Sequence, residues 1–258
     1  MEPTIDFLAG CINNQRNFPR ESHYHAVLKK SLSRLYSTDL NFNFAVYHAY
    51  RQLYEKVTGL ISKNRPDILV IFIRPFPFLI LNKPLVKYEE NDHRKVRDIH
   101  PSLFFRNKFG WPEKYFRNIK EASPETLVSR NKFGFRDLNL LAGIMLGLNR
   151  WARKFVLQEL RRVIVLCRQE NIELIFLGMP QNRESIVGSH ICTIMNKKLI
   201  SEFSKTNVNY LNIHSEKDKN GQPIFFGDGI HFNETGHLFL KDNLMPDICR
   251  IIGKKYGF

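Results

Sequence analysis

Asp228 and His231 are the residues whose types and spacing most directly suggest chemistry. They lie three apart in Phe226-Gly-Asp-Gly-Ile-His-Phe-Asn-Glu-Thr-Gly-His237, a glycine-containing loop that leads into a predicted helix. At this spacing a carboxylate can hold one imidazole nitrogen while the other nitrogen faces a nucleophile. An Asp-x-x-His pair alone is a weak signal, because such pairs also cap helices. The neighbouring residues Gly229, Asn233, Glu234 and Gly236 make the block more specific.

Cys11 is the candidate nucleophile. It follows the apolar run Ile5-Asp6-Phe7-Leu8, where a strand is expected to turn sharply toward a helix. A thiol before a helix N-terminus is well placed to ionise, and a thiolate beside an imidazole can transfer acyl groups. The other interpretation is a small cysteine packed at a strand end. Ser22, upstream of the first helix, is the alternative nucleophile.

The elements that must position these residues alternate between strands and helices. Apolar or alternating runs predict five strands, at 5–8, 40–44, 68–73, 174–178 and 208–213. Apolar residues at three- and four-residue steps predict helical faces over 46–60, 152–167, 191–203 and 240–251, the last kinked or restarted at Pro246. This order predicts a three-layer α/β fold, flavodoxin-like, with a mostly parallel five-stranded sheet and helices on both faces. Ligands of such sheets bind at the carboxyl ends of the strands.

The alternation lapses between about residues 80 and 145. We interpret this stretch as a basic insertion or lid on a single domain that spans residues 1–258. The chain has 39 Lys and Arg against 25 Asp and Glu, and residues 91–168 hold 17 of the basic residues and 7 of the acidic ones. Such a stretch can hold an anionic ligand, or it can be a solvated face. Nucleic-acid binding is the weakest interpretation, because no nucleic-acid module is recognisable.

The amino-acid composition excludes several classes of protein. A hydrophobic share of 43% and a charged share of 25% are ordinary for a folded domain of 258 residues. No apolar run approaches the roughly 18–20 residues of a membrane span, and no signal peptide is apparent, so we expect a cytoplasmic protein. The four cysteines and nine histidines lack metal-ligand spacing, and no glycine-rich phosphate motif occurs. We therefore expect neither a metal nor another cofactor.

These blocks together resemble the SGNH, or GDSL-type, esterases and acyl hydrolases. The stretch 228–237 is similar to the family's C-terminal block, and 5–12 lines up with its first strand and Gly-Asp-Ser-Leu/Ile. Residues 43–48 stand where the family has Asn-x-Gly-x-x-Gly, and 66–73 resemble the strand before Gly-x-Asn-Asp. The resemblance covers about two-thirds of the chain. It implies an acyl-ester hydrolase or O-acyltransferase that works through an acyl-enzyme.

The resemblance also implies roles for individual residues. Cys11 stands in place of the nucleophilic serine, with His231 as its general base and Asp228 holding the imidazole. Ala45 stands at the oxyanion-hole glycine, where its backbone N–H still donates. Phe76 replaces the oxyanion asparagine, and nearby Arg74 is the conjectured cationic replacement.

The expected substrate is a small-molecule or glycan-linked acyl ester. The serine, its Gly-Asp neighbours and the asparagine of the family are all replaced, so an alternative stays open. In that alternative the protein is a catalytically inactive SGNH-like binding protein that holds an anionic partner with its basic insertion. His23, His25 and His48 are expected to be surface or packing residues, and His237 to be structural.

Overall fold

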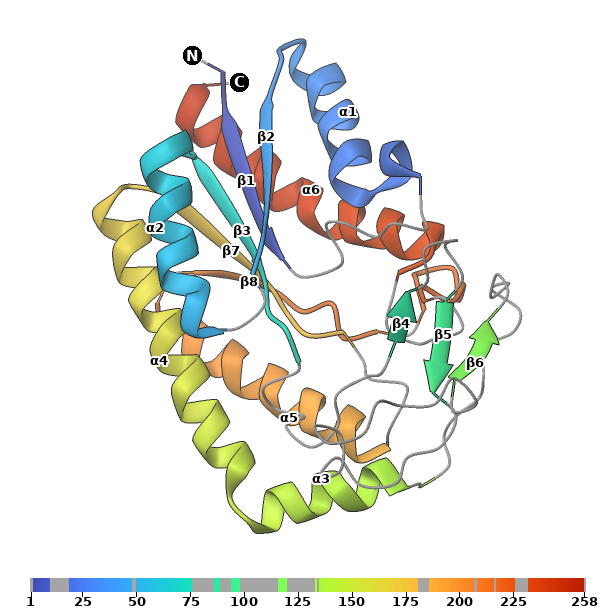
Figure 1. Ribbon diagram of the computed structural model, residues 1–258. Coiled ribbons are helices and arrows are strands. Elements are labelled where there is room, and N and C mark those ends of the chain that lie inside the picture. The colour runs from blue at the N-terminus through green and yellow to red at the C-terminus, as the bar shows by residue number, and fades with distance from the viewer. Residues whose placement is uncertain are drawn as a thin grey trace.

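The predicted strands assemble into one five-stranded sheet (Figure 1). The computed structural model describes residues 2–9, 19–47, 50–75, 86–88, 94–97, 116–119, 133, 135–180, 186–206, 208–215, 217–225 and 232–257. The strands are β1 (Thr4–Ala9), β2 (Asn41–Val46), β3 (Ile68–Phe72), β7 (Glu173–Leu177) and β8 (Asn209–Leu211), in the spatial order β2-β1-β3-β7-β8. Every pairing in this sheet is parallel, which confirms the prediction.

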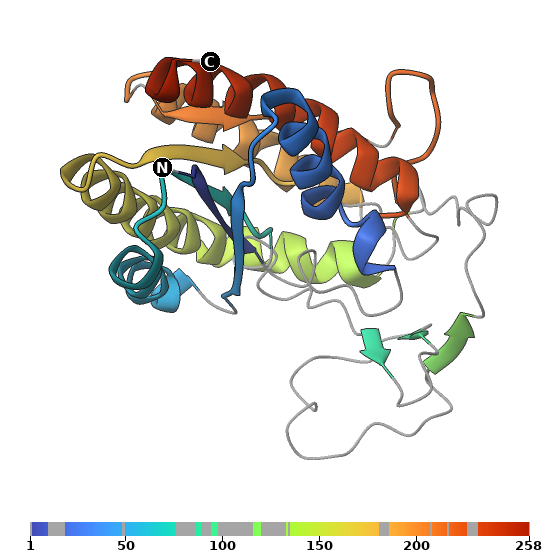
Figure 2. The ribbon, with the colours of Figure 1, turned by 90° about the horizontal axis from the view of Figure 1, so that it is seen from above.

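Helices cover both faces of this sheet, as the view from above shows (Figure 2). The helices α1 (Tyr24–Tyr36) and α6 (Glu234–Tyr256) pack on one face. The helices α2 (Leu53–Asn64), α4 (Leu148–Gln169) and α5 (Ile186–Phe203) pack on the other. All five residues of β3 are buried, as expected for a central strand between two helical layers. The three-layer α/β fold is therefore confirmed.

The helices bury the apolar faces that the sequence predicts. Helical periodicity predicts burial because residues three and four apart lie on one side of the helix. The predicted core positions of the last three long helices are all buried: Ala152, Val156, Leu160, Val163 and Cys167 in α4, Ile191, Met195, Leu199 and Phe203 in α5, and Leu240, Leu244, Ile248 and Ile251 in α6.

One predicted boundary is wrong, and one of the two alternatives predicted for Pro246 is excluded. Val46 belongs to β2 and pairs with Ala9, so the helix expected from Val46 begins only at Leu53, after a short 3-10 turn η3 (Tyr50–Gln52). Pro246 does not restart the last helix, because α6 is continuous through it. Buried Leu244 and Ile248 flank the proline, and packing of both halves on the sheet offsets the one backbone donor that proline lacks.

The remaining elements belong to the stretch between β3 and α4 and to the loop before α1. A short 3-10 turn η2 (Arg20–Ser22) precedes α1. The strands β4 (Val86–Tyr88), β5 (Arg94–Arg97) and β6 (Phe116–Ile119) form a separate antiparallel sheet. The helix α3 (Phe135–Met145) packs against α4 and α5. Within the described part of the chain, no helix has the length and apolar character needed to cross a membrane.

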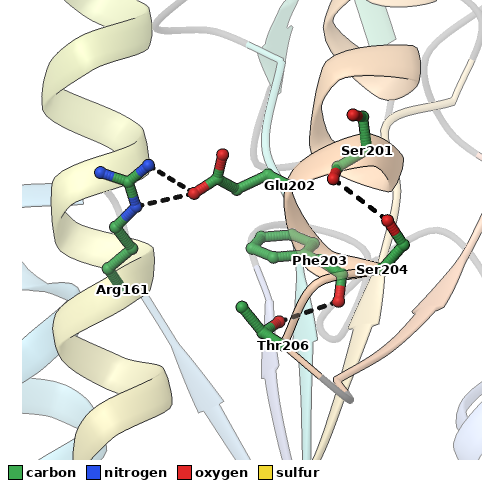
Figure 3. A network of polar contacts seen from close by, with 6 residues as sticks. All are labelled: Arg161, Ser201, Glu202, Phe203, Ser204 and Thr206. Atoms are coloured by element: carbon green, nitrogen blue, oxygen red, sulfur yellow. Dashed lines mark hydrogen bonds and ion pairs between the residues drawn. The ribbon is translucent and has the colours of Figure 1, made fainter.

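A polar bridge joins two helices of the same layer. Arg161 of α4 pairs with Glu202 of α5 through its Nε and Nη2 atoms (Figure 3). Beside it, the Thr206 hydroxyl donates to the Phe203 carbonyl over 2.9 Å at the end of α5. Arg161 is largely exposed, so this pair contributes little to stability.

Candidate active site

Tyr47 ties together the carboxyl ends of three neighbouring strands. Its backbone N–H donates to the carbonyl of Ala9, the last residue of β1, over 3.1 Å. Its hydroxyl donates to the carbonyl of Phe72, the last residue of β3, over 2.6 Å. Burial raises the pKa of Tyr47 to about 12, so the hydroxyl stays protonated and remains a donor. Tyr47 therefore stabilises the edge of the sheet at which the active site was predicted, although the sequence analysis gave Tyr47 no role of its own.

Arg74 lies at this same edge, two residues after β3, and is held in place by two tyrosines. Its Nη1 donates to the Tyr47 carbonyl over 2.7 Å, and its guanidinium lies 5.6 Å from the centre of the Tyr47 ring. Its backbone N–H donates to the Tyr50 hydroxyl over 2.9 Å. A guanidinium carries five N–H donors in a rigid plane. The arrangement therefore presents an oriented cation at the end of β3.

Ala45 lies inside β2 rather than beyond its end. It pairs in register with Leu8 of β1. Alternate residues of a parallel strand point their backbone groups at the same neighbour, and Tyr47, two residues later, donates to β1. The N–H of Ala45 consequently faces β1 and belongs to the sheet.

The predicted catalytic residues Cys11, Asp228 and His231 lie outside the described residues, as do Phe76 and His48. The structure describes the residues that flank the segments in which they lie. Ala9, two residues before Cys11 in the sequence, is the last residue of β1.

The loop that carries Asp228 and His231 is closed at its base. Phe225 and Phe232 form an antiparallel bridge, and their rings stack 4.8 Å apart. Asn233 reinforces this closure, because its Nδ2 donates to the Pro223 carbonyl over 2.9 Å and its Oδ1 accepts from the Gly236 N–H over 2.8 Å. The second of these contacts caps α6. The Asn and Gly of the sequence block thus have structural roles beside the predicted catalytic pair.

The backbone at position 236 lies so close to neighbouring atoms that only glycine fits there. A β-carbon added there would lie 2.1 Å from the carbonyl oxygen of Ile224 and 2.6 Å from Cδ1 of Phe232. Real β-carbons essentially never come within 3.0 Å of another heavy atom. The close contact seats the first turn of α6 directly against the base of the 226–231 loop.

His237 joins the first turns of two helices. It is fully buried, and its Nδ1 accepts the backbone N–H of Tyr24 over 3.2 Å. A neutral imidazole whose Nδ1 accepts carries its proton on Nε2. The predicted structural role of His237 is confirmed, and the contact is to α1 as well as to its own loop.

Two further histidines gather at this junction. His23 is buried and stacks on His237 with ring centres 5.0 Å apart, and His25 lies 5.2 Å from His23. The ring of His25 also covers Phe44 of β2 at 4.0 Å. Both are packing residues, as predicted, although their clustering with His237 was not foreseen. Among the described residues, no group of three or more His, Cys, Asp or Glu side chains is arranged to hold a metal ion.

Comparison with known proteins shows a likeness in structure only. No protein-family model matches the sequence, and no curated protein matches it. Solved structures do match. TesA superposes with a TM-score of 0.56 and 12% identity, over 96% of this chain and 99% of that one.

Two further matches are of the same kind. A lipolytic protein of the G-D-S-L family from Veillonella parvula gives a TM-score of 0.56 and 10% identity, over 96% and 98% of the two chains. Axe2, an acetylxylan esterase from Geobacillus stearothermophilus, gives 0.54 and 10%, over 98% and 96%. This chain has the SGNH-hydrolase fold. The match spans nearly the whole length of each chain, so the SGNH fold accounts for the sheet, its two helical layers and the edge at which the candidate site lies.

Proposed function

We propose that this protein hydrolyses acyl esters through a thioester formed on Cys11. The Cys11 sulfur attacks the acyl carbonyl while His231 accepts the thiol proton, and His231 then gives that proton to the departing alkoxide. Water next attacks the thioester, with His231 as base, and releases the carboxylic acid and the thiol. Asp228 orients the imidazole. A second alcohol in place of water would make the same site an acyltransferase.

The hydrogen bond from Tyr24 to His237 is the observation that carries this proposal. Tyr24 begins the helix that follows the Cys11 segment, and His237 lies in the first turn of the helix that follows the Asp228 and His231 loop. The bond therefore brings together the first turns of the two helices that follow the candidate catalytic segments. Nucleophilic catalysis by a cysteine and a histidine requires this kind of proximity.

The proposed oxyanion site consists of the Cys11 backbone N–H and the Arg74 guanidinium. The two tyrosine contacts of Arg74 support this role, because a donor fixed before reaction needs no reorganisation when the oxyanion forms. The backbone N–H of Ala45 faces β1, so the proposed site does not include it.

The proposed substrate is an acyl ester with an anionic or glycan-linked group. Two observations support this class. Acetylxylan esterases are among the structural neighbours. The segment 91–168 also carries ten more basic than acidic residues, which favours an anionic group on the substrate.

Hydrolysis of a short-chain aryl ester tests the mechanism. We expect Cys11→Ala and His231→Ala each to lower kcat/KM by about 10³-fold or more. Ser22→Ala, which removes the alternative nucleophile, is the matched control and should keep the parent value. Equal rates in the parent and in both catalytic variants would refute the mechanism. Loss of activity in Ser22→Ala alone would move the nucleophile to Ser22.

A mass measurement separates the enzyme from the inactive binding protein. Brief incubation with an activated acyl donor, followed by acid quench, should give an intact mass increased by one acyl group, and the Cys11→Ala variant should show no increase. No adduct and no hydrolysis, together with saturable binding of an anionic ester, would support the binding protein instead.

Arg74 has a separate test. Arg74→Met keeps an apolar stem against Tyr47 and removes the cation, so we expect kcat to fall by about 10²–10³-fold with KM changed much less. Arg161→Met is the control, because Arg161 lies in an exposed pair with Glu202 far along α4. Equal effects of the two substitutions would remove Arg74 from the oxyanion site.

A further inference from the structure

The corner between α3 and α4 exposes an unusual set of large apolar side chains. Met145 is 88% exposed, Leu146 is 72% exposed and Trp151 is 66% exposed. We call the whole set the apolar corner: Leu138, Leu141, Ile144, Met145, Leu146 and Trp151. Single exposed apolar residues are ordinary, but a contiguous group marks a surface that binds something.

The exposure follows from how α3 is seated. Its inner side is fixed by Leu140, which is buried, and by Asp137, whose carboxylate accepts the Val187 N–H of α5 over 2.8 Å. Leu138, Leu141 and Met145 follow one another at three- and four-residue steps on the outer side. The helix thus turns a second apolar stripe away from the core, where an ordinary surface helix carries charged residues.

The charged residues within the sequence segment that forms the apolar corner are all basic. Residues 138–158 contain no Asp or Glu, and they include three basic residues on α4: Arg150, Arg153 and Lys154. Arg150 and Lys154 are exposed, and Arg153 is half-buried. Trp151 lies among them and stacks on Phe155 with ring centres 5.8 Å apart. An apolar surface with an exposed tryptophan and a basic border fits the boundary of an anionic lipid layer.

The apolar corner lies at the end of the molecule that carries the candidate active site. The C-terminus of α4 leads directly into β7, so the N-terminus of α4 lies toward the carboxyl ends of the parallel strands. Figure 1 shows α3 and the first turns of α4 along this lower edge of the protein. A surface that docked here would face the same side as the strand ends at Ala9 and Phe72.

We propose that the apolar corner docks the protein peripherally on an anionic phospholipid bilayer. Leu141, Met145 and Leu146 enter the interfacial layer, and the three basic residues contact lipid headgroups. A second copy fits less well, because a two-fold pairing would place Arg150 and Lys154 near their own symmetry mates. The proposal does not rest on ester hydrolysis, because it is tested by measuring the binding of the protein to lipid vesicles.

Flotation with lipid vesicles tests this proposal. The intact protein is mixed with vesicles of phosphatidylcholine alone or with about 30% phosphatidylglycerol. We expect binding to the anionic vesicles that weakens when salt rises from about 0.05 to 0.5 M, as headgroup attraction is screened. In a Trp111→Phe background, the emission of Trp151 should shift to the blue on binding and be quenched by brominated acyl chains.

Met145→Asp combined with Leu146→Asp should lower the partition coefficient by about tenfold or more, because both charges must enter the interface. Leu35→Asp is the matched control. Leu35 is also exposed, but it lies at the opposite end of the molecule, near the C-terminus of α1, and its substitution should leave binding unchanged.

Three outcomes would overturn the proposal. They are absence of binding to anionic vesicles, unchanged binding by the double variant, and a concentration-dependent dimer in size-exclusion chromatography that the double variant abolishes. The last result would assign the apolar corner to a second copy. Unchanged circular dichroism of the double variant ensures that any loss of binding reflects the surface.

Discussion

The backbone N–H of Tyr24 donates to Nδ1 of His237 over 3.2 Å, across 213 residues of sequence. Tyr24 is the first residue of α1, and its N–H has no acceptor within its own helix. His23, the residue before it, makes no side-chain cap hydrogen bond. The cap of α1 is therefore supplied by a histidine of α6, and this contact links the helices that follow the two candidate catalytic segments.

Substitution of His237 should cost both stability and activity. In His237→Phe the buried Tyr24 N–H loses its acceptor, so we expect the free energy of unfolding to fall by about 1–3 kcal/mol. His237→Asn keeps an acceptor oxygen and should recover part of this loss. Urea unfolding measures the stability, and aryl-ester kcat/KM measured well below the transition measures the activity. Equal stability of the Phe and Asn variants would contradict the capping role.

Gly236 and Gly59 form a matched pair for substitution by alanine. The Gly236→Ala β-carbon would collide with the Ile224 carbonyl and Phe232, so we expect a loss of at least about 2 kcal/mol and a displaced 226–231 loop. Gly59 lies within α2, with no atom near its added β-carbon, so Gly59→Ala should stabilise the protein by about 0.5–1 kcal/mol. Thermal unfolding measures whether stability falls in Gly236→Ala and rises in Gly59→Ala. A neutral Gly236→Ala would show that the base of the loop is not rigid.

The thiols should differ sharply in reactivity. Burial raises the pKa of Cys167 and of Cys192 to about 12, so both should resist iodoacetamide at pH 7.5 in the folded protein. We expect fast alkylation of Cys11 alone in a Cys249→Ser background, followed by peptide mapping. His231→Ala should slow this reaction, because it removes the base beside the thiol. Alkylation of Cys11 only after unfolding in urea would contradict its proposed role as nucleophile.

Asp67 should make stability depend on pH. Burial alone raises the pKa of its carboxyl, but hydrogen bonds from Lys255 and the Thr4 N–H outweigh burial and lower that pKa below its ordinary value. A pKa lowered on folding means that the carboxylate stabilises the protein above pH 4 and loses that effect as pH falls further. Asp67→Asn should reduce the free energy of unfolding by about 1 kcal/mol at pH 7, since the pair is partly exposed.

The difference between parent and Asp67→Asn should shrink progressively as the pH falls below about 4, measured by urea unfolding at a series of acidic pH values. Asp242→Asn, at an exposed position of the same helix as Lys255, should change stability by less than about 0.5 kcal/mol throughout. A gap between parent and Asp67→Asn that persists in acid would mean that the ion pair is not its source.

The sequence by itself determined the layers of the fold and the faces that they bury. Apolar residues at three- and four-residue steps predicted the inner faces of α4, α5 and α6, and the continuous run in β3 predicted a central strand. These signals are local, because a helix or strand repeats within a few residues. The candidate residues Asp228, His231 and Cys11 were proposed from local spacing and from the resemblance to the SGNH family, and they lie outside the described residues, so they stay predictions.

Tertiary structure alone decided what depends on contacts between distant segments. Asp6 interrupts an apolar run, yet it is buried because Asn43 and Asn64 each donate to its carboxylate over 2.8 Å. The cap of α1 by His237 and the passage of α6 through Pro246 likewise arise from packing across the sheet. Periodicity cannot reveal such pairs, because each partner's environment exists only after the chain has brought them together.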